Sequence, residues 1–586
     1  RPVLSVEPWI SIQIDQPGDV GQVGVRCADR AGNVGDFAWV EPEPPVSAPD
    51  RPGPWALWAA EPTAQVPRDA PPPSNPRQSF ELWAMRGESE GFQIVVRPES
   101  ELHRAHMAFT ELKSEAGAVI PSRWLAYHFV NYVRIESNSR ATPQDELVWP
   151  GPADYPDELS DDLRRDLPAG QVQPIFVRVT VPRNAAGVYR GRAYFVCDEG
   201  RQAVDITLRV VAATLPERTR LKFVYWFSWD APCRKFEVEQ FSEDGWRVLR
   251  RIGELMHAYH QNVVVVPQGL IEAWQDDTGK IVCDFRHFDR FIRTFQQAGV
   301  DALFCLSHVG GRTTGEWTCP TMSPHPVTAR KLSSGEQVRL TTLDLLPAVQ
   351  EHVEKLGLLE RFAVHVADEP IKENVQSYRE LSAEVRRRAP KLRRIDAIHV
   401  PDLRGSLEIW VPQLNYFDEW LNEYRTAQQE GYEIWFYVAW VPQGHYPNRM
   451  IDSHAIKPRV LHWMNYIYDT SGYLHWALNH WQIPLTSLGS PGDQYITWPS
   501  SRYIANSSLR YEAERDGLDD CQLMFSLEEA LVRGGLDRNT AHQRISRLAQ
   551  GAVRSFRDFA KDWESYEAIR RQLLDELARR TGPAAR

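Results

Sequence analysis

The sequence lacks the features that define several common protein classes. No run of about 18 apolar residues is present, so no membrane-spanning helix is expected. The formal net charge is −11, whereas nucleic-acid binding requires a basic face. The G-x-S-x-G, Walker, H-E-x-x-H and Rossmann glycine motifs are also missing. These absences argue against membrane proteins, nucleic-acid binders, serine hydrolases, nucleotide enzymes and zinc proteases.

Cysteine is sparse, and its spacing indicates no shared site. The seven cysteines include no C-x-x-C pair, so neither a disulfide framework nor a zinc ribbon is indicated. Cys305, His308, Cys319 and His325 are possible metal ligands by residue type. Cys305 and His308, however, lie three residues apart in a predicted strand and would face opposite sides of it. We therefore predict no metal site and no cofactor.

Aromatic residues, by contrast, are abundant: the chain has 21 Trp, 20 Tyr and 22 Phe. Trp is a costly core filler, because its N–H needs a hydrogen-bond partner. Flat rings also stack on sugars, so an uncharged carbohydrate ligand is one interpretation of this composition. The other is that a large protein uses many aromatic anchors.

The 586 residues are too many for one core, since domains have about 100–200 residues. We predict an immunoglobulin-like fragment and proline-rich linker over 1–45, a β-sandwich over 46–216, a (β/α)8 barrel over 217–508 and a helical region over 509–586. The chain opens on Arg1 without a charged-then-apolar leader, so we expect a mature or trimmed form. We expect an extracellular or periplasmic location rather than a cytoplasmic one.

The sandwich is predicted from short β-branched and aromatic runs separated by turn residues. They lie at 54–60, 78–85, 91–98, 173–182, 188–196 and 203–211. The segments 69–76 and 151–168, rich in proline and in acidic residues respectively, are predicted loops.

From residue 221 the pattern changes to alternating strands and helices. Eight strands over about 260 residues fit a (β/α)8 barrel. They are predicted at 221–229, 262–267, 301–308, 361–368, 394–400, 407–414, 433–440 and 473–481. Helical spacing of apolar residues marks 247–259 and 342–357, and 309–341 reads as a long loop. The tail carries an amphipathic stripe from Ile545 to Leu573, which predicts a helix packed outside the barrel rather than a coiled coil.

The run RFAVHVADEP (361–370) carries the strongest functional signal. Its strand is apolar on both faces, as in a buried parallel sheet, and Pro370 ends it. Asp368 and Glu369 then lie at the carboxyl end of the strand, where α/β barrels keep their chemistry. Neighbouring side chains of a regular strand face opposite ways, so both acids reach one substrate only if the strand ends or twists there. The alternative is an ordinary acidic pair at the start of a surface loop.

Several segments, taken in order, resemble the bacterial glycosidase-like proteins related to glycoside hydrolase family 123. They are FELWAMRGESEGFQIVVRP (80–98), VPRNAAGVYRGRAYF (181–195), HVADEP (365–370), IDAIHV (395–400), IWVPQL (409–414), 449–481, GDQYITWP (492–499) and 509–531. The likeness covers roughly 55–535. It implies an exo-acting β-N-acetylgalactosaminidase whose substrate is a terminal β-linked N-acetylhexosamine of glycans or glycolipids.

The resemblance also implies roles for the acidic pair. The sugar's own 2-acetamido oxygen would attack the anomeric carbon, so no enzyme nucleophile is needed. Glu369 would protonate the departing oxygen and later act as base, which gives net retention. Asp368 would stay ionised, orient the acetamido N–H and offset the positive charge of the intermediate.

Other polar and aromatic residues near strand ends are candidate substrate contacts, each with a structural alternative. They are His365, Asn415, Asp418, Glu419, Tyr437, Trp440, Trp476, Asn479 and Trp481, with Asp493 as a further loop candidate. Tyr437 would donate to the acetamido oxygen, or simply satisfy its buried hydroxyl. Trp476 and Trp481 would wall the sugar, or pack the barrel top. Asp418 and Glu419 would bind the 4- or 6-hydroxyl, or cap a helix.

Three competing functions remain open from the sequence. One is a glycosidase acting on N-acetylglucosamine or a non-acetamido hexose, since a fold does not determine its substrate. Another is a carbohydrate-binding protein that has lost catalysis, against which the intact acidic pair argues. A structural or adhesive protein would explain the immunoglobulin-like start but not the acids. The oligomeric state is left open.

Overall fold

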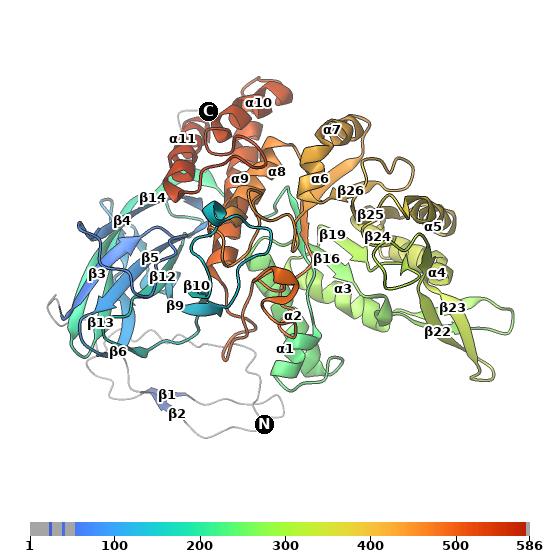
Figure 1. The fold of residues 1–586 in the computed structure, drawn as a ribbon, viewed down its shortest axis with the longest axis horizontal. Helices are drawn as coiled ribbons and strands as arrows, with labels where there is room; N and C mark the ends of the chain where they lie inside the picture. Colours follow the sequence, from blue (N-terminus) through green and yellow to red (C-terminus); the bar gives the residue numbers. More distant parts are fainter. Residues whose placement is uncertain (1–22, 26–37, 41–52, 582–586) are drawn as a thin grey trace.

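The chain folds into a strand-rich domain, a mostly parallel eight-stranded barrel and a set of C-terminal helices (Figure 1). The computed structural model describes residues 23–25, 38–40 and 53–581. Most of the predicted immunoglobulin-like fragment and linker lies outside these residues. Two of its strands are described, β1 (Val23–Val25) and β2 (Ala38–Val40), and they pair antiparallel. No helix in the described part of the chain is long and apolar enough to cross a membrane.

The strand-rich domain consists of two packed sheets. One sheet has the order β10-β9-β12-β5-β3, and the other has the main order β11-β6-β13-β14-β4 with β7 and β8 at its side. Their bounds are β3 Trp55–Ala60, β4 Ser79–Arg86, β5 Ser89–Pro98, β6 Leu102–Phe109, β7 Leu112–Ser114, β8 Val119–Ile120, β9 Leu125–Ile135, β10 Ala153–Leu159, β11 Arg165–Leu167, β12 Gln173–Thr180, β13 Gly187–Cys197 and β14 Gly200–Thr214. All six predicted strands are present, and the inner faces of the two sheets share one apolar core.

The prediction of a loop over 151–168 is wrong, because this segment forms β10 and β11. Its acidic residues suggested solvent exposure, but Asp157 is buried and pairs with Arg510, whose Nε and Nη2 each lie 2.8 Å from a carboxylate oxygen. A buried carboxylate is tolerated when it is paired and hydrogen-bonded. The acidic composition therefore reflects a domain contact rather than a loop.

All eight predicted barrel strands are present in chain order. They are β15 Lys222–Tyr225, β16 Val263–Val266, β19 Leu303–Leu306, β24 Phe362–His365, β25 Arg393–Ile398, β26 Ile409–Pro412, β27 Glu433–Tyr437 and β28 Gly472–His475, and they pair in the order β15-β28-β27-β26-β25-β24-β19-β16. Side chains bridge the remaining gap between β15 and β16. Asn262 Oδ1 accepts the Phe223 N–H at 2.9 Å and Gln261 Oε1 accepts the Tyr225 N–H at 3.0 Å, so the barrel is nearly closed.

Helices and short strands connect the barrel strands. The helices are α1 Asp230–Lys235, α2 Glu243–Ala258, α3 Arg286–Ala298, α4 Thr342–Lys355, α5 Val375–Arg388, α6 Leu414–Glu419, α7 Leu421–Gln429 and α8 Lys457–Ile467. The predicted helices 247–259 and 342–357 correspond to α2 and α4. The predicted loop 309–341 instead contains β20 (Gly310–Arg312), β21 (Met322–Pro324), β22 (Pro326–Lys331) and β23 (Gln337–Thr341). The last two extend a small sheet with β17 (Glu272–Gln275) and β18 (Ile281–Asp284).

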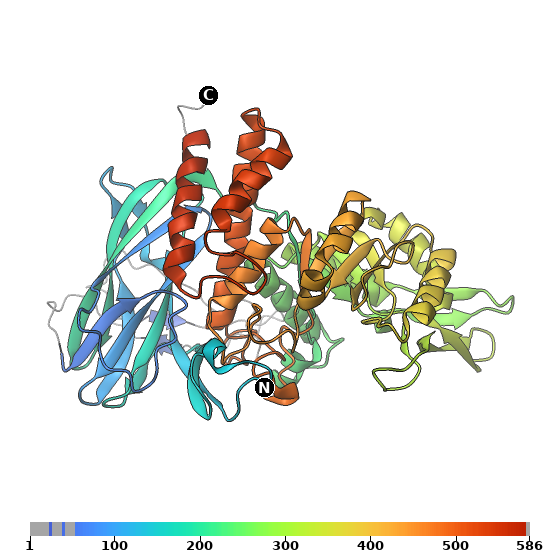
Figure 2. The same cartoon turned by 45° about the horizontal axis from the view of Figure 1, so that its top comes forward.

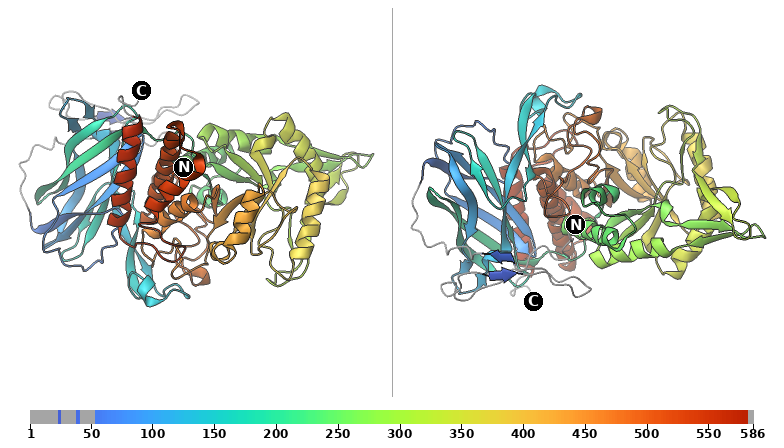
Figure 3. Two further views of the ribbon diagram at one scale, coloured as in Figure 1. Left: turned by 90° about the horizontal axis from the view of Figure 1, so that it is seen from above. Right: turned by 90° about the horizontal axis from the view of Figure 1, so that it is seen from below.

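The C-terminal helices lie between the sandwich and the barrel in every view (Figures 2 and 3). They are α9 (Leu509–Arg533), α10 (Arg538–Ala549) and α11 (Trp563–Thr581). The predicted amphipathic stripe is therefore not one helix, since the chain leaves the helical conformation between α10 and α11. Its residues are nevertheless buried, among them Phe556, Phe559 and Trp563. They cover the sandwich as well as the barrel, because Trp563 contributes to the core between the sandwich sheets.

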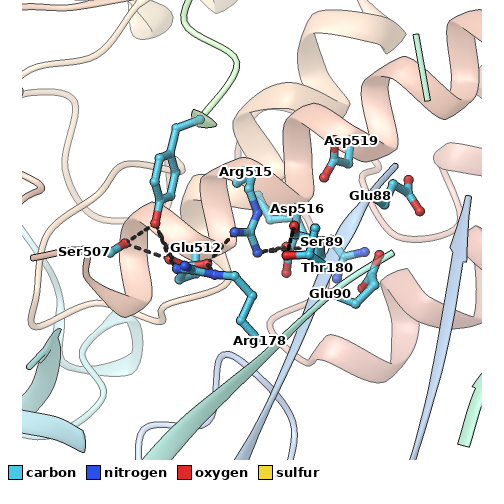
Figure 4. A network of polar contacts seen from close by, with 12 residues as sticks. Glu88, Ser89, Glu90, Arg178, Thr180, Ser507, Glu512, Arg515, Asp516 and Asp519 are labelled. Carbon is cyan, nitrogen blue, oxygen red and sulfur yellow. Dashed lines mark hydrogen bonds and ion pairs between the residues drawn. The ribbon is translucent and has the colours of Figure 1, made fainter. Parts of the chain in front are cut away.

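Buried charged groups join α9 and α11 to the sandwich, and Figure 4 shows those around α9. Glu512 accepts hydrogen bonds from Arg178 of β12 and from Ser507, and Arg515 lies 2.8 Å from its second oxygen. Arg570 of α11 reaches Glu88 at 2.8 Å and Glu90 at 2.6 Å. Truncating one partner of such a buried pair costs about 3–5 kcal/mol, because the other charge is left unpaired.

The pH dependence of stability is expected to differ between two carboxylates of this interface. Burial raises the pKa of Glu88 to about 7, although Arg570 opposes the shift. A raised folded pKa gives stability that is complete below about pH 4.5 and is lost as the pH rises through 7. We predict that Glu88→Gln becomes more stable relative to the unsubstituted protein between pH 4.5 and 8, by on the order of 3 kcal/mol. Urea unfolding at a series of pH values measures this.

Glu512→Gln is the matched control with the opposite sign. Although burial opposes it, Arg178 and Arg515 lower the pKa of Glu512 to about 2. Its contribution is therefore constant above about pH 4.5 and is lost as the pH falls through 2. Parallel pH profiles of stability for both variants and the unsubstituted protein would contradict these assignments.

Candidate active site

The acidic pair follows β24 on a loop that has left the strand conformation. The strand ends at His365, three residues before Asp368. Glu369 has a φ of +51°, a left-handed conformation that is uncommon outside glycine and is found at functional sites. Its N–H donates to the Ala397 carbonyl of β25 at 3.1 Å. The strand therefore ends before the two acids, which is the condition under which both can reach one substrate.

Arg312 of β20 holds the backbone of both acids. Its Nη1 donates to the Asp368 carbonyl at 3.1 Å and its Nη2 to the Glu369 carbonyl at 2.8 Å. Its Nε donates to the Trp317 carbonyl at 2.8 Å, and its guanidinium lies 4.2 Å from the centre of the Trp317 ring. One side chain thus ties the acid loop to the loop between β20 and β21.

Glu369 is surrounded by donors at the ends of the next strands. The Tyr437 hydroxyl donates to Oε1, and His399 Nε2 lies 3.4 Å from the same oxygen. Gln413 Nε2 donates to the Tyr437 oxygen at 3.2 Å. Burial opposes ionisation of Glu369, but the contacts with His399 and Tyr437 outweigh it and lower the pKa of the carboxyl.

Asp368 is set deep among protein atoms, but 47% of its side-chain surface is open to a cavity. The surrounding protein atoms remove water from the Asp368 carboxyl, and this burial, together with the negative charge of Glu369, raises the pKa of Asp368 to about 7. His308 Nε2 lies 3.8 Å from Asp368 Oδ1 and opposes the shift. In the free protein the pair therefore holds its proton more readily on Asp368 than on Glu369.

Asp396 of β25 lies fully buried beneath the pair, and sequence analysis missed it. Its Oδ2 accepts the N–H groups of Val366 (3.1 Å) and Ala367 (2.6 Å) and the Tyr378 hydroxyl (2.9 Å). Its Oδ1 faces His365 Nδ1 at 3.0 Å and His308 Nε2 at 3.2 Å. A signal for it existed, because a carboxylate interrupts an otherwise apolar strand in IDAIHV (395–400).

The electrostatics of this cluster make Asp396 a permanent anion. Burial opposes ionisation, but the two histidines hold the pKa of Asp396 far below its usual range. Burial also opposes the charge on His308, yet Asp396 raises the pKa of His308 to about 9. A cation at His308 thus stands between the buried Asp396 and the more open Asp368.

A cavity of about 390 Å³ lies above these groups. Its lining includes His308, Arg312, Thr314, Trp317, His325 and Asp368. A second hollow, of about 440 Å³, lies between β4 and α11, outside the barrel. We place the candidate site at the first, because it is lined by Asp368 of the acidic pair, whereas the second includes neither acid. The lining of the first cavity combines a few polar and charged side chains with one flat ring, which is typical of small-molecule sites.

Among the described residues, two groups of side chains have possible metal-ligand atoms close enough together to bind one ion. They are His308, His365 and Asp396 in the barrel, and Asp145, Glu146 and His445 outside it. Neither includes Cys305, Cys319 or His325, so the structure does not bring together the four residues considered from the sequence. The six described cysteines are all free.

Of the other predicted contacts, Tyr437 is the one found beside the acids. His365 is buried and bound to Asp396. Asn479 uses both amide atoms on the backbone of Ser228, at 2.8 and 3.0 Å. Trp481 donates to the Thr497 carbonyl at 2.8 Å. Each of these three side chains thus has at least one polar atom bound by the protein itself.

The remaining candidates are spread around the barrel. Trp476 donates to the buried Asp493 at 2.8 Å and packs against the barrel interior. Asp418 accepts from the Tyr446 hydroxyl at 2.9 Å and pairs with Arg557 at 3.3 Å, so it faces the segment before α11. Three further candidates keep open surface: Asn415 is half-buried, Glu419 is exposed, and Trp440 is 46% exposed.

A parallel barrel with adjacent acids at the carboxyl end of one strand, one of them lining a cavity, is an arrangement compatible with a glycoside hydrolase. Two family models match the chain: the glycoside hydrolase 123 catalytic domain over residues 226–527 and the glycoside hydrolase 123 N-terminal domain over residues 64–195. The first covers slightly more than half of the chain. The protein therefore belongs to glycoside hydrolase family 123.

One solved structure has a similar fold over nearly its whole length. A family 123 glycoside hydrolase from Clostridium perfringens, described in terms of glycolipid glycan hydrolysis, is similar with a TM-score of 0.68 and 14% identity, over 91% of this chain and 98% of that one. The β-D-glucuronidase of Dictyoglomus thermophilum reaches a TM-score of 0.27 and 8% identity, over 74% and 67% of the two chains, which is too low to carry an argument. No curated protein sequence is significantly similar to this chain.

Proposed function

We propose that this family 123 glycoside hydrolase is an exo-acting β-N-acetylgalactosaminidase that uses the 2-acetamido group of its substrate as the nucleophile. The observation that carries the proposal is the adjacent pair Asp368 and Glu369, one open to the cavity and the other bound by Tyr437 and His399. The two acids are neighbours on one loop, whereas an enzyme nucleophile and a separate acid would flank the sugar from opposite sides. A nucleophile carried by the substrate resolves this.

In this mechanism the acetamido oxygen forms a bond to the anomeric carbon while the glycosidic bond breaks. Glu369 gives its proton to the departing oxygen. Asp368 accepts the acetamido N–H and offsets the positive charge of the oxazolinium ring. Water then opens the ring, Glu369 takes a proton from it, and the anomeric configuration is retained.

The proton must move between the two acids before this chemistry begins. The free protein favours the proton on Asp368, whereas Glu369 has to be the donor. A substrate N–H that donates to Asp368, beside the cationic His308, stabilises the ionised form of Asp368. The charge on Asp368 then raises the proton affinity of Glu369. Substrate binding thus sets the protonation that catalysis uses.

The substrate is proposed to be a terminal β-linked N-acetylhexosamine, with the galacto configuration preferred by family resemblance. The structural relative from Clostridium perfringens is described as acting on glycolipid glycans, which suggests the same source here. An extracellular or periplasmic location would give access to such glycans.

A panel of p-nitrophenyl glycosides tests the proposal. We expect turnover of the β-N-acetylgalactosaminide, and at least about 10²-fold lower kcat/KM for the matching galactoside without the acetamido group, because its nucleophile is missing. A thiazoline analogue of the N-acetyl sugar should inhibit as a mimic of the intermediate. Efficient cleavage of the plain galactoside would point to a different glycosidase mechanism, and no turnover of any member would point to a binding protein.

A further inference from the structure

The second cavity, between β4 and α11, lies apart from the acidic pair, and we call it the interface cavity. Its volume of about 440 Å³ is within the usual range of small-molecule sites. Its lining comes from the start of β4, from Arg77 just before it, and from the first turns of α11. β4 and α11 lie at the sandwich end of the molecule, whereas the barrel strands β24 and β25 lie toward the other end (Figure 1). The interface cavity is therefore separate from the candidate active site.

Two aromatic rings of the lining are already packed by the protein. Phe80 stacks on Phe92 with ring centres 5.1 Å apart, and the ring centre of Trp563 lies 5.7 Å from that of Phe80. The exposed fractions of Phe80 and Trp563 are 3% and 8%. These rings offer a ligand little open face for stacking, so recognition has to come from the polar groups of the lining.

One part of the lining consists of ion-paired side chains that join α11 to the sandwich. Arg571 Nε lies 3.0 Å from Glu567 Oε1, and Arg571 Nη1 lies 3.5 Å from Glu81 Oε2. Glu81 also pairs with Arg209 of β14. These contacts hold both walls of the cavity in place, and an ordered surface loses little conformational entropy when a ligand binds to it.

The other polar groups of the lining have no hydrogen-bond or ion-pair partner among the described residues. They are the Trp563 indole N–H, the Arg77 guanidinium, the Ser79 hydroxyl and the Glu564 carboxylate. The indole nitrogen is not fully buried although the ring is, so its N–H opens into space that a ligand can reach. Arg77 lies over the Phe80 ring at 5.7 Å, and Ser79 and Glu564 are exposed. Four unused polar groups thus surround one cavity.

The four unused groups fit a neutral ligand that is rich in hydroxyl groups. The indole N–H and the Arg77 guanidinium donate, the Glu564 carboxylate accepts, and the Ser79 hydroxyl does both. With Arg209 bound to Glu81, the carboxylates and guanidiniums around the cavity are equal in number. A charged ligand would meet a like charge at Arg77 or at Glu564, whereas a hydroxyl group can serve either residue.

We infer that the interface cavity is a second, non-catalytic binding site for a neutral sugar residue. The site itself is inferred from its lining, and the choice of a sugar rests on the proposed function, in which the substrate is a glycan. Hydroxyl groups on one sugar ring accept from Trp563 and Arg77 and donate to Glu564 at the same time. Because this site and the acids lie toward opposite ends of the molecule, it holds a different sugar from the one that is cleaved. A second contact of this kind raises the effective concentration of neighbouring glycan chains at the barrel.

Fluorine NMR of the protein labelled with 5-fluorotryptophan observes the interface cavity directly. The resonance that is missing from Trp563→Phe belongs to Trp563. We expect this resonance to shift when galactose, glucose or N-acetylgalactosamine is added to the unsubstituted protein. In Arg77→Ala the half-saturating sugar concentration should be about 10-fold higher, because a hydrogen bond from a charged group is lost.

Arg123→Ala is the matched control, because Arg123 is an exposed arginine of the sandwich that does not line the cavity. It should leave the titration unchanged. Calorimetric titration of unlabelled Arg77→Ala and Arg123→Ala gives the same comparison without replacing the buried Trp563. Sodium sulfate and glycine serve as anionic and zwitterionic probes. A Trp563 shift with either of them but with none of the sugars would overturn the sugar assignment, and no shift with any probe would remove the site.

Turnover measurements separate this inference from the proposed function. Arg77→Ala should change kcat/KM on a soluble p-nitrophenyl glycoside by less than about 2-fold, but lower the rate on β-N-acetylgalactosaminides displayed densely on agarose beads by about 5-fold or more. Equal rates on beads for Arg77→Ala and Arg123→Ala would remove the role in retaining glycan chains. Sugar binding at Trp563 without turnover of any glycoside would keep the site and contradict the proposed function, whereas turnover without a Trp563 shift would do the reverse.

Discussion

Replacing Glu369 with glutamine is expected to lower kcat/KM about 10³-fold on substrates with a sugar leaving group and far less on a nitrophenyl glycoside. A general acid contributes about 10²–10⁴-fold, and only when the departing oxygen needs a proton. Nitrophenolate leaves without one. Glutamine retains the volume and a hydrogen-bond acceptor for Tyr437, so the loop should stay in place. Kinetics on a disaccharide and on the p-nitrophenyl glycoside measure the difference.

Asp368→Asn provides the comparison, because its proposed role does not involve the leaving group. It should slow every N-acetyl substrate by a similar factor. The two roles would be reversed if Asp368→Asn, rather than Glu369→Gln, showed the dependence on leaving group. That outcome would mean that the proton stays on Asp368, where the free protein favours it. Equal losses for Glu369→Gln on both substrates would remove the acid role altogether.

The barrel could be predicted from sequence because its strands are short, mostly apolar runs that in most cases alternate with helices. Strands such as β24 and β26 are buried throughout, so their hydrophobicity is local information. The acids could be located for the same reason, since Asp368 and Glu369 directly follow one of these runs. The strand β10 was missed because its acidic residues suggested a loop, whereas its buried Asp157 pairs with Arg510, more than 300 positions away.

The partners of the acids could not be predicted, since they come from elements far apart in the chain. Arg312 and Trp317 lie in a segment that reads as a loop, and His399 and Tyr437 follow two different strands. Polar residues near strand ends were the available signal, but it does not tell which of them face the cavity. Asn479 and Asp418 carry the same signal as Tyr437, yet their atoms are used by Ser228 and by Arg557.

Asp396→Asn is expected to be the most destabilising single substitution in the barrel interior, at about 3–5 kcal/mol near pH 6. The carboxylate is fully buried and faces five donor groups, two of which are histidine nitrogens. The amide has one oxygen to accept with and places N–H hydrogens against other donors. Activity should fall with stability, because the Val366 and Ala367 N–H groups that Asp396 holds lead into Asp368. Urea unfolding and residual activity of the folded variant measure the two effects.

The pH dependence of this effect follows from His308. Its pKa is raised to about 9 in the folded protein, so the stability from its pairing with Asp396 is complete below about pH 6.5 and is lost as the pH rises through 9. The loss caused by Asp396→Asn should therefore be largest near pH 6 and smaller at pH 9.5. A loss that does not change with pH would mean that His308 is uncharged in the folded protein.

Asp493→Asn is the matched control, because Asp493 is equally buried in the barrel but has the opposite pKa shift. Burial raises the pKa of Asp493 to about 6, against the opposing effect of Arg449 and the Trp476 hydrogen bond. Its charge is thus poorly compensated at neutral pH, and an asparagine oxygen still accepts from Trp476. We expect a change within about 1 kcal/mol at pH 7. If both substitutions cost the same, burial alone would explain them, and the Asp396–histidine cluster would lose its special role in holding the acid loop.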